Sequence, residues 1–201
     1  MAGNQSELIR IGVLALQGNV REHMDAFEEA CASLQIPHEI LPIRHADEIR
    51  DLSVIAIPGG ESTTIARLVD KNWMREEMVR FKGSYFVTCA GMVLVSSEVI
   101  GEDRYKPLGI VDISVNRNAF GRQKESFEAD ITIQGLGTPF HAVFIRAPTV
   151  VRTGPDVKPL ASLDKGVVAL QAGRHMAFSF HPELSGDIRL HTLFLSTILS
   201  G

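Results

Sequence analysis

The 201-residue chain has little of what marks several broad classes of protein. Its two cysteines cannot build a framework of disulfides, and no apolar run approaches the roughly 18 residues of a membrane span. The first ten residues lack the apolar stretch of a signal peptide. A net charge of −4, from 20 Lys and Arg against 24 Asp and Glu, argues against nucleic-acid binding through a basic surface. We therefore expect a cytoplasmic protein with reduced thiols and with neither membrane nor nucleic acid among its partners.

The first half of the chain alternates between short apolar segments and helical patterns. Buried strands are predicted over residues 9–16, 38–41, 54–57 and 85–88. Apolar residues three or four positions apart predict a helix between Val20 and Leu34, in which Cys31 belongs to the apolar stripe and is expected in the core. Further helices are predicted through residues 67–78 and over residues 90–99. Strands that alternate with helices are typical of a mostly parallel sheet covered on both faces.

The second half of the chain shows strand patterns separated by turn-rich pieces. The strand-like segments are residues 110–115, 129–133, 142–145, 167–170 and 176–180, and they indicate antiparallel additions to the sheet. An amphipathic helix closes the chain, with apolar residues from Leu190 to Leu199 on one side. No internal repeat or linker interrupts the sequence. It therefore predicts one α/β domain over residues 1–201, a three-layer, mostly parallel open sheet flanked by helices.

Cys89 falls between a predicted strand and the helix predicted to follow it. A sharp strand-to-helix turn holds a nucleophile out from the backbone, and Gly91 leaves room beside it. The free N–H groups at the start of a helix favour a thiolate and can face a developing oxyanion. The alternative interpretation is a small buried apolar residue, which is the usual role of an intracellular cysteine.

His181-Pro182-Glu183 follows the last predicted strand, at a sheet edge where the sites of α/β proteins gather. In extended backbone His181 and Glu183 point to the same side, and Pro182 stiffens the arrangement. A thiol nucleophile needs a base, and the base needs an orienting acceptor, so this tripeptide can supply both. A His-x-Glu pattern is also a common surface feature. The other histidines have no such setting and are expected to be structural or exposed: His23, His38, His45, His141, His175 and His191.

Residues 58–64 (PGGESTT) join a predicted strand to a helix. Gly59 and Gly60 permit unusual backbone angles and let a ligand approach the backbone N–H groups closely. Because no Gly-Lys-Ser/Thr follows, an oxyanion loop is favoured over a phosphate cradle. The alternative interpretation is a Gly-Gly turn with a Ser/Thr helix cap.

Taken together, these motifs resemble those of a known family. PGGESTT (58–64), TCAG (88–91) and HPEL (181–184) are similar to the motifs of class I triad glutamine amidotransferases, which implies their flavodoxin-like fold. Four further segments resemble the glutaminase subunit of pyridoxal 5′-phosphate synthase: IGVLALQG (11–18), NRNAFGRQ (116–123), SFEAD (126–130) and FIRAP (144–148). The resemblance covers nearly the whole chain.

The family hydrolyses glutamine to glutamate and ammonia, and the resemblance implies a role for each matching residue. Cys89 would attack the amide, His181 would transfer the proton, and Glu183 would orient His181. Gly60 and Ala90 would supply the N–H groups of the oxyanion site. The positions that match the family's glutamine-binding residues are Gly60, Glu61, Ser62, Arg117, Ile145 and Arg146. The resemblance also implies that no metal or cofactor is needed, and that a (β/α)₈-barrel synthase subunit takes up the ammonia.

Two other functions stay open at the level of the sequence. The chain could be another cysteine hydrolase on the same sheet, such as a peptidase or a glutaminase that serves a different synthase. It could also be a non-catalytic binding subunit, although the intact Cys/His/Glu set weighs against this. One position departs from the family, which usually has glycine two residues before the nucleophile. Here that residue is Val87, whose branched side chain needs room beside the turn.

Overall fold

A computed structural model of the chain describes residues 8–117 and 126–200. Its helices are α1 (Val20–Ser33), α2 (Ser62–Lys71), α3 (Arg75–Arg80), α4 (Ala90–Val95) and α5 (Arg189–Leu199), with short 3-10 helices η1 (Ala46–Ile49) and η2 (Pro182–Leu184). The strands of the first half are β1 (Ile9–Leu14), β2 (His38–Ile43), β3 (Val54–Ile57), β4 (Ser84–Thr88), β5 (Ser96–Val99) and β6 (Val111–Asn116). Those of the second half are β7 (Ser126–Ile131), β8 (Phe140–Ile145), β9 (Thr149–Thr153), β10 (Val157–Leu163), β11 (Gly166–Ala172) and β12 (His175–Phe178). Residues 118–123 of the predicted NRNAFGRQ motif lie outside the described residues.

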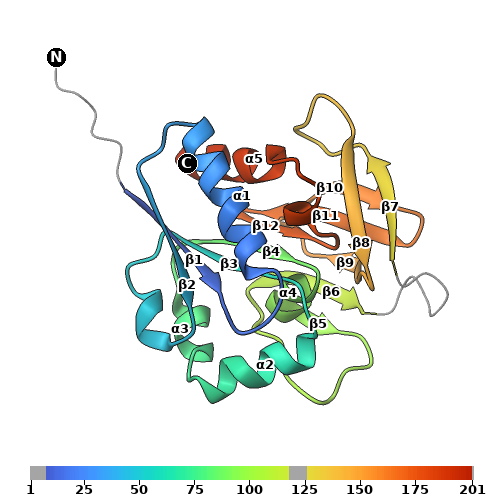
Figure 1. The fold of residues 1–201 in the computed structure, drawn as a ribbon. Helices are drawn as coiled ribbons and strands as arrows, with labels where there is room; N and C mark the ends of the chain where they lie inside the picture. Colours follow the sequence, from blue (N-terminus) through green and yellow to red (C-terminus); the bar gives the residue numbers. More distant parts are fainter. Residues whose placement is uncertain (1–7, 118–125, 201) are drawn as a thin grey trace.

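The large sheet runs in the order β2-β1-β3-β4-β12-β11-β9-β6-β5, with β10 paired to β11 (Figure 1). From β2 to β12 every neighbouring pair is parallel, whereas β11 and β9 pair antiparallel with their neighbours. β7 and β8 form a separate antiparallel pair beside this sheet. The predicted fold, a mostly parallel sheet with antiparallel additions, is therefore confirmed.

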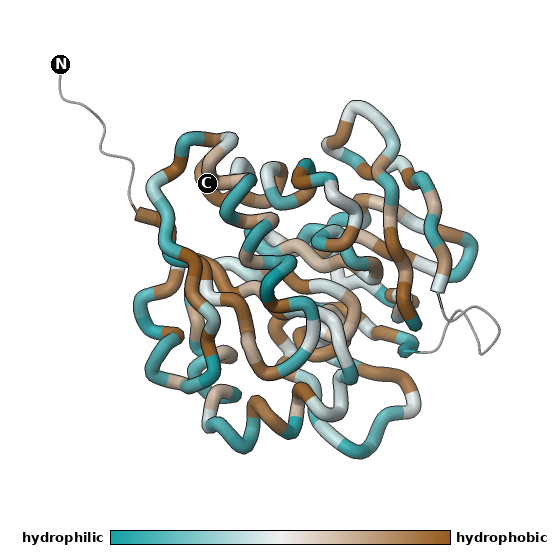
Figure 2. Tube along the Cα trace, viewed as in Figure 1, coloured by the Kyte–Doolittle hydropathy of each residue, from teal (hydrophilic) through white to brown (hydrophobic). Residues whose placement is uncertain are grey.

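Two apolar clusters lie on the two faces of the large sheet, each between the sheet and a layer of helices. One cluster joins the sheet to α1 and α5, and the other joins the opposite face to α2, α3 and α4 (Figure 1). The helical stripe of α1 places Phe27 and Cys31 in the first cluster with no exposed surface, as the spacing predicts. Figure 2 shows hydrophobic colour along the central strands and hydrophilic colour along the outer loops and helix turns. No helix within the two described ranges combines the length and apolar character needed to cross a bilayer.

Several predicted elements have different bounds in the structure. The helix predicted over residues 90–99 is wrong in its second half, because α4 ends at Val95 and β5 begins at once. The Ser96 hydroxyl donates to the Val93 carbonyl at 2.8 Å, and the extended backbone of Ser96 (φ −61°, ψ 161°) turns the chain into the sheet beside β6. β9 and β10 had no counterpart in the prediction. Pro159 and two register shifts interrupt the pattern of β10, which its outer position in the sheet tolerates.

Candidate active site

Cys89 lies at the turn between β4 and α4, in a backbone conformation with φ 48° and ψ −107°. This is strained for a residue with a side chain, and such strain is concentrated at functional sites. The Cys89 N–H donates to the Phe178 carbonyl of β12 at 2.8 Å, which fixes the turn against the neighbouring strand. A Cβ atom at Gly91 would lie 2.4 Å from the Ile57 carbonyl oxygen, so this position of the turn requires glycine.

His181 lies close to Cys89 because β12 lies directly beside β4. The two strands pair in parallel, with Phe178 opposite Thr88, so the residues that follow each strand emerge at the same edge. The His181 imidazole and the Cys89 side chain both lie within 3.2 Å of the position that a Cβ atom would take on Gly59, and Cys89 helps to raise the pKa of His181. His181 Nδ1–H donates to Glu183 Oε1 at 2.7 Å. The structure thus brings Cys89, His181 and Glu183 together as a Cys-His-Glu series, and their catalytic roles stay a prediction.

The electrostatics of this series favour a charged pair. Burial lowers the pKa of His181, but hydrogen bonds to Cys89 and Glu183 outweigh burial and raise that pKa to about 10. Burial raises the pKa of Glu183, but His23 and His181 outweigh it and lower that pKa to about 2. Glu183 is therefore a buried carboxylate that stabilises an imidazolium on His181, which is what a base needs after it accepts a thiol proton.

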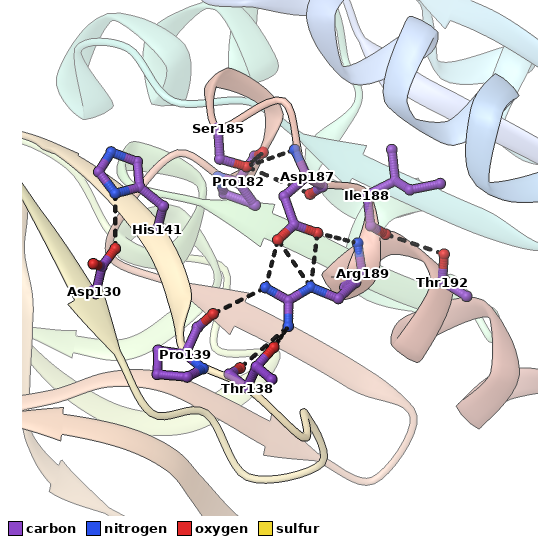
Figure 3. A network of polar contacts seen from close by, with 10 residues as sticks. All are labelled: Asp130, Thr138, Pro139, His141, Pro182, Ser185, Asp187, Ile188, Arg189 and Thr192. Atoms are coloured by element: carbon purple, nitrogen blue, oxygen red, sulfur yellow. Dashed lines mark hydrogen bonds and ion pairs between the residues drawn. The ribbon is translucent and has the colours of Figure 1, made fainter.

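The segment after His181 is anchored by a network of polar contacts (Figure 3). The Ser185 hydroxyl donates to the Pro182 carbonyl at 2.7 Å, and it accepts from the Asp187 N–H at 3.1 Å. The Arg189 guanidinium donates to Asp187 at 2.6 Å and to the Thr138 hydroxyl at 2.7 Å. These contacts hold η2 and the start of α5 against the β7–β8 connection, so the segment that carries Glu183 is fixed in position.

A cavity of about 650 Å³ opens above Cys89 and His181. It is lined by every predicted substrate or oxyanion residue, namely Gly60, Glu61, Ser62, Ala90, Arg117, Ile145 and Arg146. Glu183 lies behind His181, away from the cavity lining. Val87 does not line the cavity either, because its side chain is 1% exposed and packs in the cluster around α2, α3 and α4. The departure at this position is therefore accommodated within the core.

The oxyanion loop predicted at Gly59 and Gly60 packs tightly against Cys89 and His181. A Cβ atom at Gly59 would lie 2.3 Å from His181 Cε1, so a larger residue would displace the imidazole. Gly60 has φ +145°, a backbone angle that favours glycine. The loop is held from the end of β1 by Gln17, whose Oε1 accepts the Glu61 N–H at 2.8 Å. The LQG sequence of residues 16–18 therefore supports this loop, a role that the sequence did not reveal.

One end of the cavity carries paired charges. Glu61 caps α2 by accepting from Thr64 N at 2.7 Å, and Arg117 donates to the same carboxylate at 3.0 Å. Burial raises the pKa of Glu61, but hydrogen bonds from Thr64 and Thr63 outweigh it and bring that pKa to about 2. Arg117 also donates to Glu102, whose side chain is 4% exposed in the loop after β5. Sequence reasoning missed Glu102, because a single acid in a polar loop resembles any solvated charge.

The far side of the cavity is formed by the end of β8. The Ile145 carbonyl oxygen lies 3.6 Å from Cys89 Sγ, and Arg146 adopts a left-handed backbone with φ 44°. Strain at Arg146 turns the chain away from β8 at the point where it meets the thiol. Among the described residues, no group of three or more His, Cys, Asp or Glu side chains is arranged to hold a metal ion.

His23 contradicts the expectation that the remaining histidines have no connection to the site. It is fully buried on α1, and its Nε2 lies 3.4 Å from Glu183 Oε2 and 3.1 Å from Thr88 Oγ1. The expectation holds for other histidines. His38 and His141 pair with surface acids, His175 accepts the Tyr85 N–H at 3.1 Å, and His191 packs in the core.

Comparison with known proteins identifies the family. The sequence profile of the SNO glutamine amidotransferase family matches residues 13–200. The chain belongs to this family of glutamine amidotransferases. Its relatives include pyridoxal 5′-phosphate synthase subunit PdxT of Methanospirillum hungatei, 54% identical over 99% of this chain and 100% of that one. The PdxT subunit of Methanosphaerula palustris is 55% identical over 94% of this chain and 96% of its own length.

Solved structures agree with this assignment to the glutamine amidotransferases. A crystal structure described as a glutamine amidotransferase has a TM-score of 0.82 and 41% identity, covering 94% of this chain and 98% of the other. A glutamine amidotransferase from Thermotoga maritima, at 12% identity and a TM-score of 0.56, shares the fold over 96% of both chains. The predicted class I glutamine amidotransferase fold and the family resemblance are thus confirmed.

Proposed function

We propose that this amidotransferase is the glutaminase subunit of a pyridoxal 5′-phosphate synthase and forms one domain over residues 1–201. It hydrolyses L-glutamine to L-glutamate and passes the ammonia to a synthase subunit for vitamin B6 biosynthesis. The observation that carries the proposal is the Cys89–His181–Glu183 series at the floor of a cavity lined by the matching glutamine-binding positions. Full-length similarity to PdxT subunits supports this assignment.

The reaction follows from the arrangement of these side chains. His181 takes the Cys89 thiol proton, and Sγ attacks the amide carbon of glutamine to form a tetrahedral oxyanion. Backbone N–H groups of Gly60 and Ala90 stabilise that oxyanion. When it collapses, the C–N bond breaks and His181 returns the proton to the leaving nitrogen, which departs as ammonia. Water, deprotonated by His181, then cleaves the glutamyl thioester and releases glutamate and the free thiol.

The paired charges at the cavity end suit the amino-acid portion of the substrate. A glutamine zwitterion carries an ammonium that complements Glu61 and a carboxylate that complements Arg117. Glu61 and Arg117 form an ion pair with each other in this structure. Bound glutamine would replace this one ion pair with two, one between its ammonium and Glu61 and one between its carboxylate and Arg117. Gly60, Ser62, Ile145 and Arg146 complete the proposed glutamine site, and Glu102 supports Arg117 from behind.

Arg117→Met should raise the KM for glutamine with a smaller effect on kcat. Loss of a charge-assisted pair costs about 1.5–3 kcal/mol, so we expect KM to rise roughly 10- to 100-fold. Steady-state glutamate release over a range of glutamine concentrations measures this change. Arg152→Met is the matched control, because Arg152 pairs with Asp112 on the surface and does not line the cavity. An unchanged KM in Arg117→Met would remove Arg117 from the proposed site.

The proposed partner is a (β/α)₈-barrel synthase subunit in a hetero-oligomeric complex. Free ammonia would be lost to water or protonated, so direct transfer to a bound synthase fits the chemistry. The phosphorylated substrates would bind to that partner, and this chain needs no cofactor for its own reaction. We place the enzyme in the cytoplasm, where a catalytic thiol stays reduced, and both described cysteines are free thiols.

The isolated chain should be a poor glutaminase that its synthase partner activates. Gly60 and the preceding glycine let the loop peptide turn between states with its N–H directed toward or away from the oxyanion. A partner that selects the first state restores one donor, which is worth roughly 10²- to 10³-fold in rate. Glutamate release from glutamine, measured while the synthase subunit is titrated in, tests both the function and this coupling.

A Cys89→Ala chain mixed with the same partner gives the background rate. No hydrolysis above that background at saturating partner would contradict the glutaminase function and favour a non-catalytic subunit. Full activity without the partner would instead show that the oxyanion site is already assembled. Cleavage of peptides in preference to glutamine would indicate another cysteine hydrolase.

A further inference from the structure

We propose that His23 is a positioning residue that holds the Glu183 carboxylate in the orientation His181 requires. The inference rests on the proposed function, in which Glu183 orients the catalytic base. His23 comes from α1, a helix that contributes nothing else to the Cys-His-Glu series. Its contact with Glu183 joins residues far apart in the sequence, so only the fold brings the two side chains together.

The geometry divides the two oxygens of Glu183 between two histidines. His181 Nδ1 lies 2.7 Å from Oε1, whereas His23 Nε2 lies 3.4 Å from Oε2. The side chains of His23 and Glu183 are both 0% exposed, so water does not substitute for either contact. Asn19 Nδ2 donates a further hydrogen bond to Oε1 at 3.3 Å, so Oε1 accepts from both Asn19 and His181. Oε2 has no hydrogen-bond partner among the described residues, and His23 Nε2 lies beside it at 3.4 Å.

The buried surroundings select one tautomer of His23. Its Nδ1 has no hydrogen-bond partner among the described residues. A proton on Nδ1 would be a buried unpaired donor, and the Nε2 lone pair would then face a carboxylate. A proton on Nε2 removes both penalties, because it can be donated to the Thr88 hydroxyl at 3.1 Å and it turns the positive edge of the ring toward Glu183 Oε2 at 3.4 Å. Burial, the largest influence, lowers the pKa of His23, which agrees with a neutral imidazole that donates from Nε2.

His23 is itself held rigidly, as a positioning residue must be. Its ring packs edge-on against Phe86, with 6.1 Å between centroids, and against His191 at the same separation. Nε2 also lies 3.1 Å from the Thr88 hydroxyl, next to the nucleophile in sequence. One imidazole thus contacts both the strand that presents Cys89 and the acid that orients His181. A glutamate has three rotatable side-chain bonds, so a second fixed contact restricts how its carboxylate turns.

The test compares His23→Met with His23→Gln, two side chains of nearly equal length and shape. The glutamine amide can place a donor where Nε2 lies, whereas methionine cannot donate. In the presence of saturating synthase partner, we expect His23→Met to lower kcat roughly 10- to 100-fold and leave KM within about twofold. His23→Gln should recover most of that loss. If His23→Met does not fold, as judged by circular dichroism, His23→Leu replaces it.

His191→Met is the matched control, because His191 is equally buried and stacks on Phe86, but neither of its ring nitrogens has a hydrogen-bond partner among the described residues. It should retain the wild-type kcat. A second readout is the downfield proton NMR signal of His181 Nδ1–H, which reports the hydrogen bond to Glu183. This signal should shift or broaden in His23→Met and persist in His23→Gln and His191→Met.

Wild-type kcat and an unmoved His181 signal in His23→Met would overturn the proposal. Equal losses in His23→Met, His23→Gln and His191→Met would also overturn it, because they would indicate core packing alone. Absence of glutamine hydrolysis in the wild-type complex would count against the proposed function. The NMR comparison needs no turnover, so it still decides the role of His23 in that case.

Discussion

Cys89→Ala is expected to abolish glutamine hydrolysis while leaving the fold and partner binding intact. The substitution removes the atom that forms the thioester, and the alanine methyl group offers no nucleophile in its place. Removal of a covalent nucleophile costs several orders of magnitude in rate. The measurement is steady-state glutamate release in the presence of the synthase partner, beside circular dichroism and a binding assay for that partner.

Cys31→Ala supplies the matched control, since Cys31 is a fully buried thiol on α1. Burial raises the pKa of Cys31 to about 11, which keeps it protonated and unreactive at neutral pH. An electrophilic glutamine analogue should therefore label Cys89 and leave Cys31 unmodified. Labelling mainly at Cys31, or wild-type activity in Cys89→Ala, would sink the assignment of the nucleophile.

Glu183→Gln should produce the second large effect. The amide keeps the shape of the side chain, but it cannot stabilise an imidazolium and can present its NH₂ group to His181 Nδ1. We expect kcat to fall roughly 10²- to 10⁴-fold. Because Glu183 helps to raise the pKa of His181, the variant should also have a lower His181 pKa, measurable by NMR titration.

Glu22→Gln tests whether any nearby negative charge has the same effect. Glu22 is an exposed acid on α1, adjacent in sequence to His23, and it lies outside the cavity lining. It should retain the wild-type kcat and His181 pKa. If Glu183→Gln matches the wild-type rate at saturating glutamine, Glu183 is not part of the catalytic series.

The parallel half of the fold was predictable because its signals are local. β4 is a short, fully buried apolar run, and the turn that follows it contains Cys89 and the glycine that the close approach of Ile57 requires. The stripe of α1 likewise predicts which face is buried. The end of α4 was not predictable, because residues 96–99 continue a pattern that suits a helix or a strand. Pairing with β6 decides between them, and that pairing is a property of the fold.

The candidate site likewise contains residues that local sequence motifs identify and residues that only the fold brings into the site. Cys89, His181 and Glu183 stand in motifs whose spacing implies their chemistry. His23 and Glu102 carry no such signal, because each is connected to the site only through a contact with a residue distant in sequence. A lone histidine in a helical stripe is more often a core residue, and a lone acid in a loop is more often solvated. Only the burial of these two side chains beside their charged partners distinguishes them from that background.

The pairing of β4 with β12 fixes the positions of Cys89 and His181, whereas the loop at Gly60 lies outside this pairing. Cys89 and His181 follow neighbouring strands inside the sheet, and the Cys89 N–H donates to the Phe178 carbonyl of the adjacent strand. The distance between Cys89 and His181 is thus set by the backbone hydrogen bonds between β4 and β12, and these break only when the sheet opens. The donors at Gly60 stand on a loop outside these hydrogen bonds. Under the proposed function, a docked synthase would change the rate through this loop and would leave Cys89 and His181 in place.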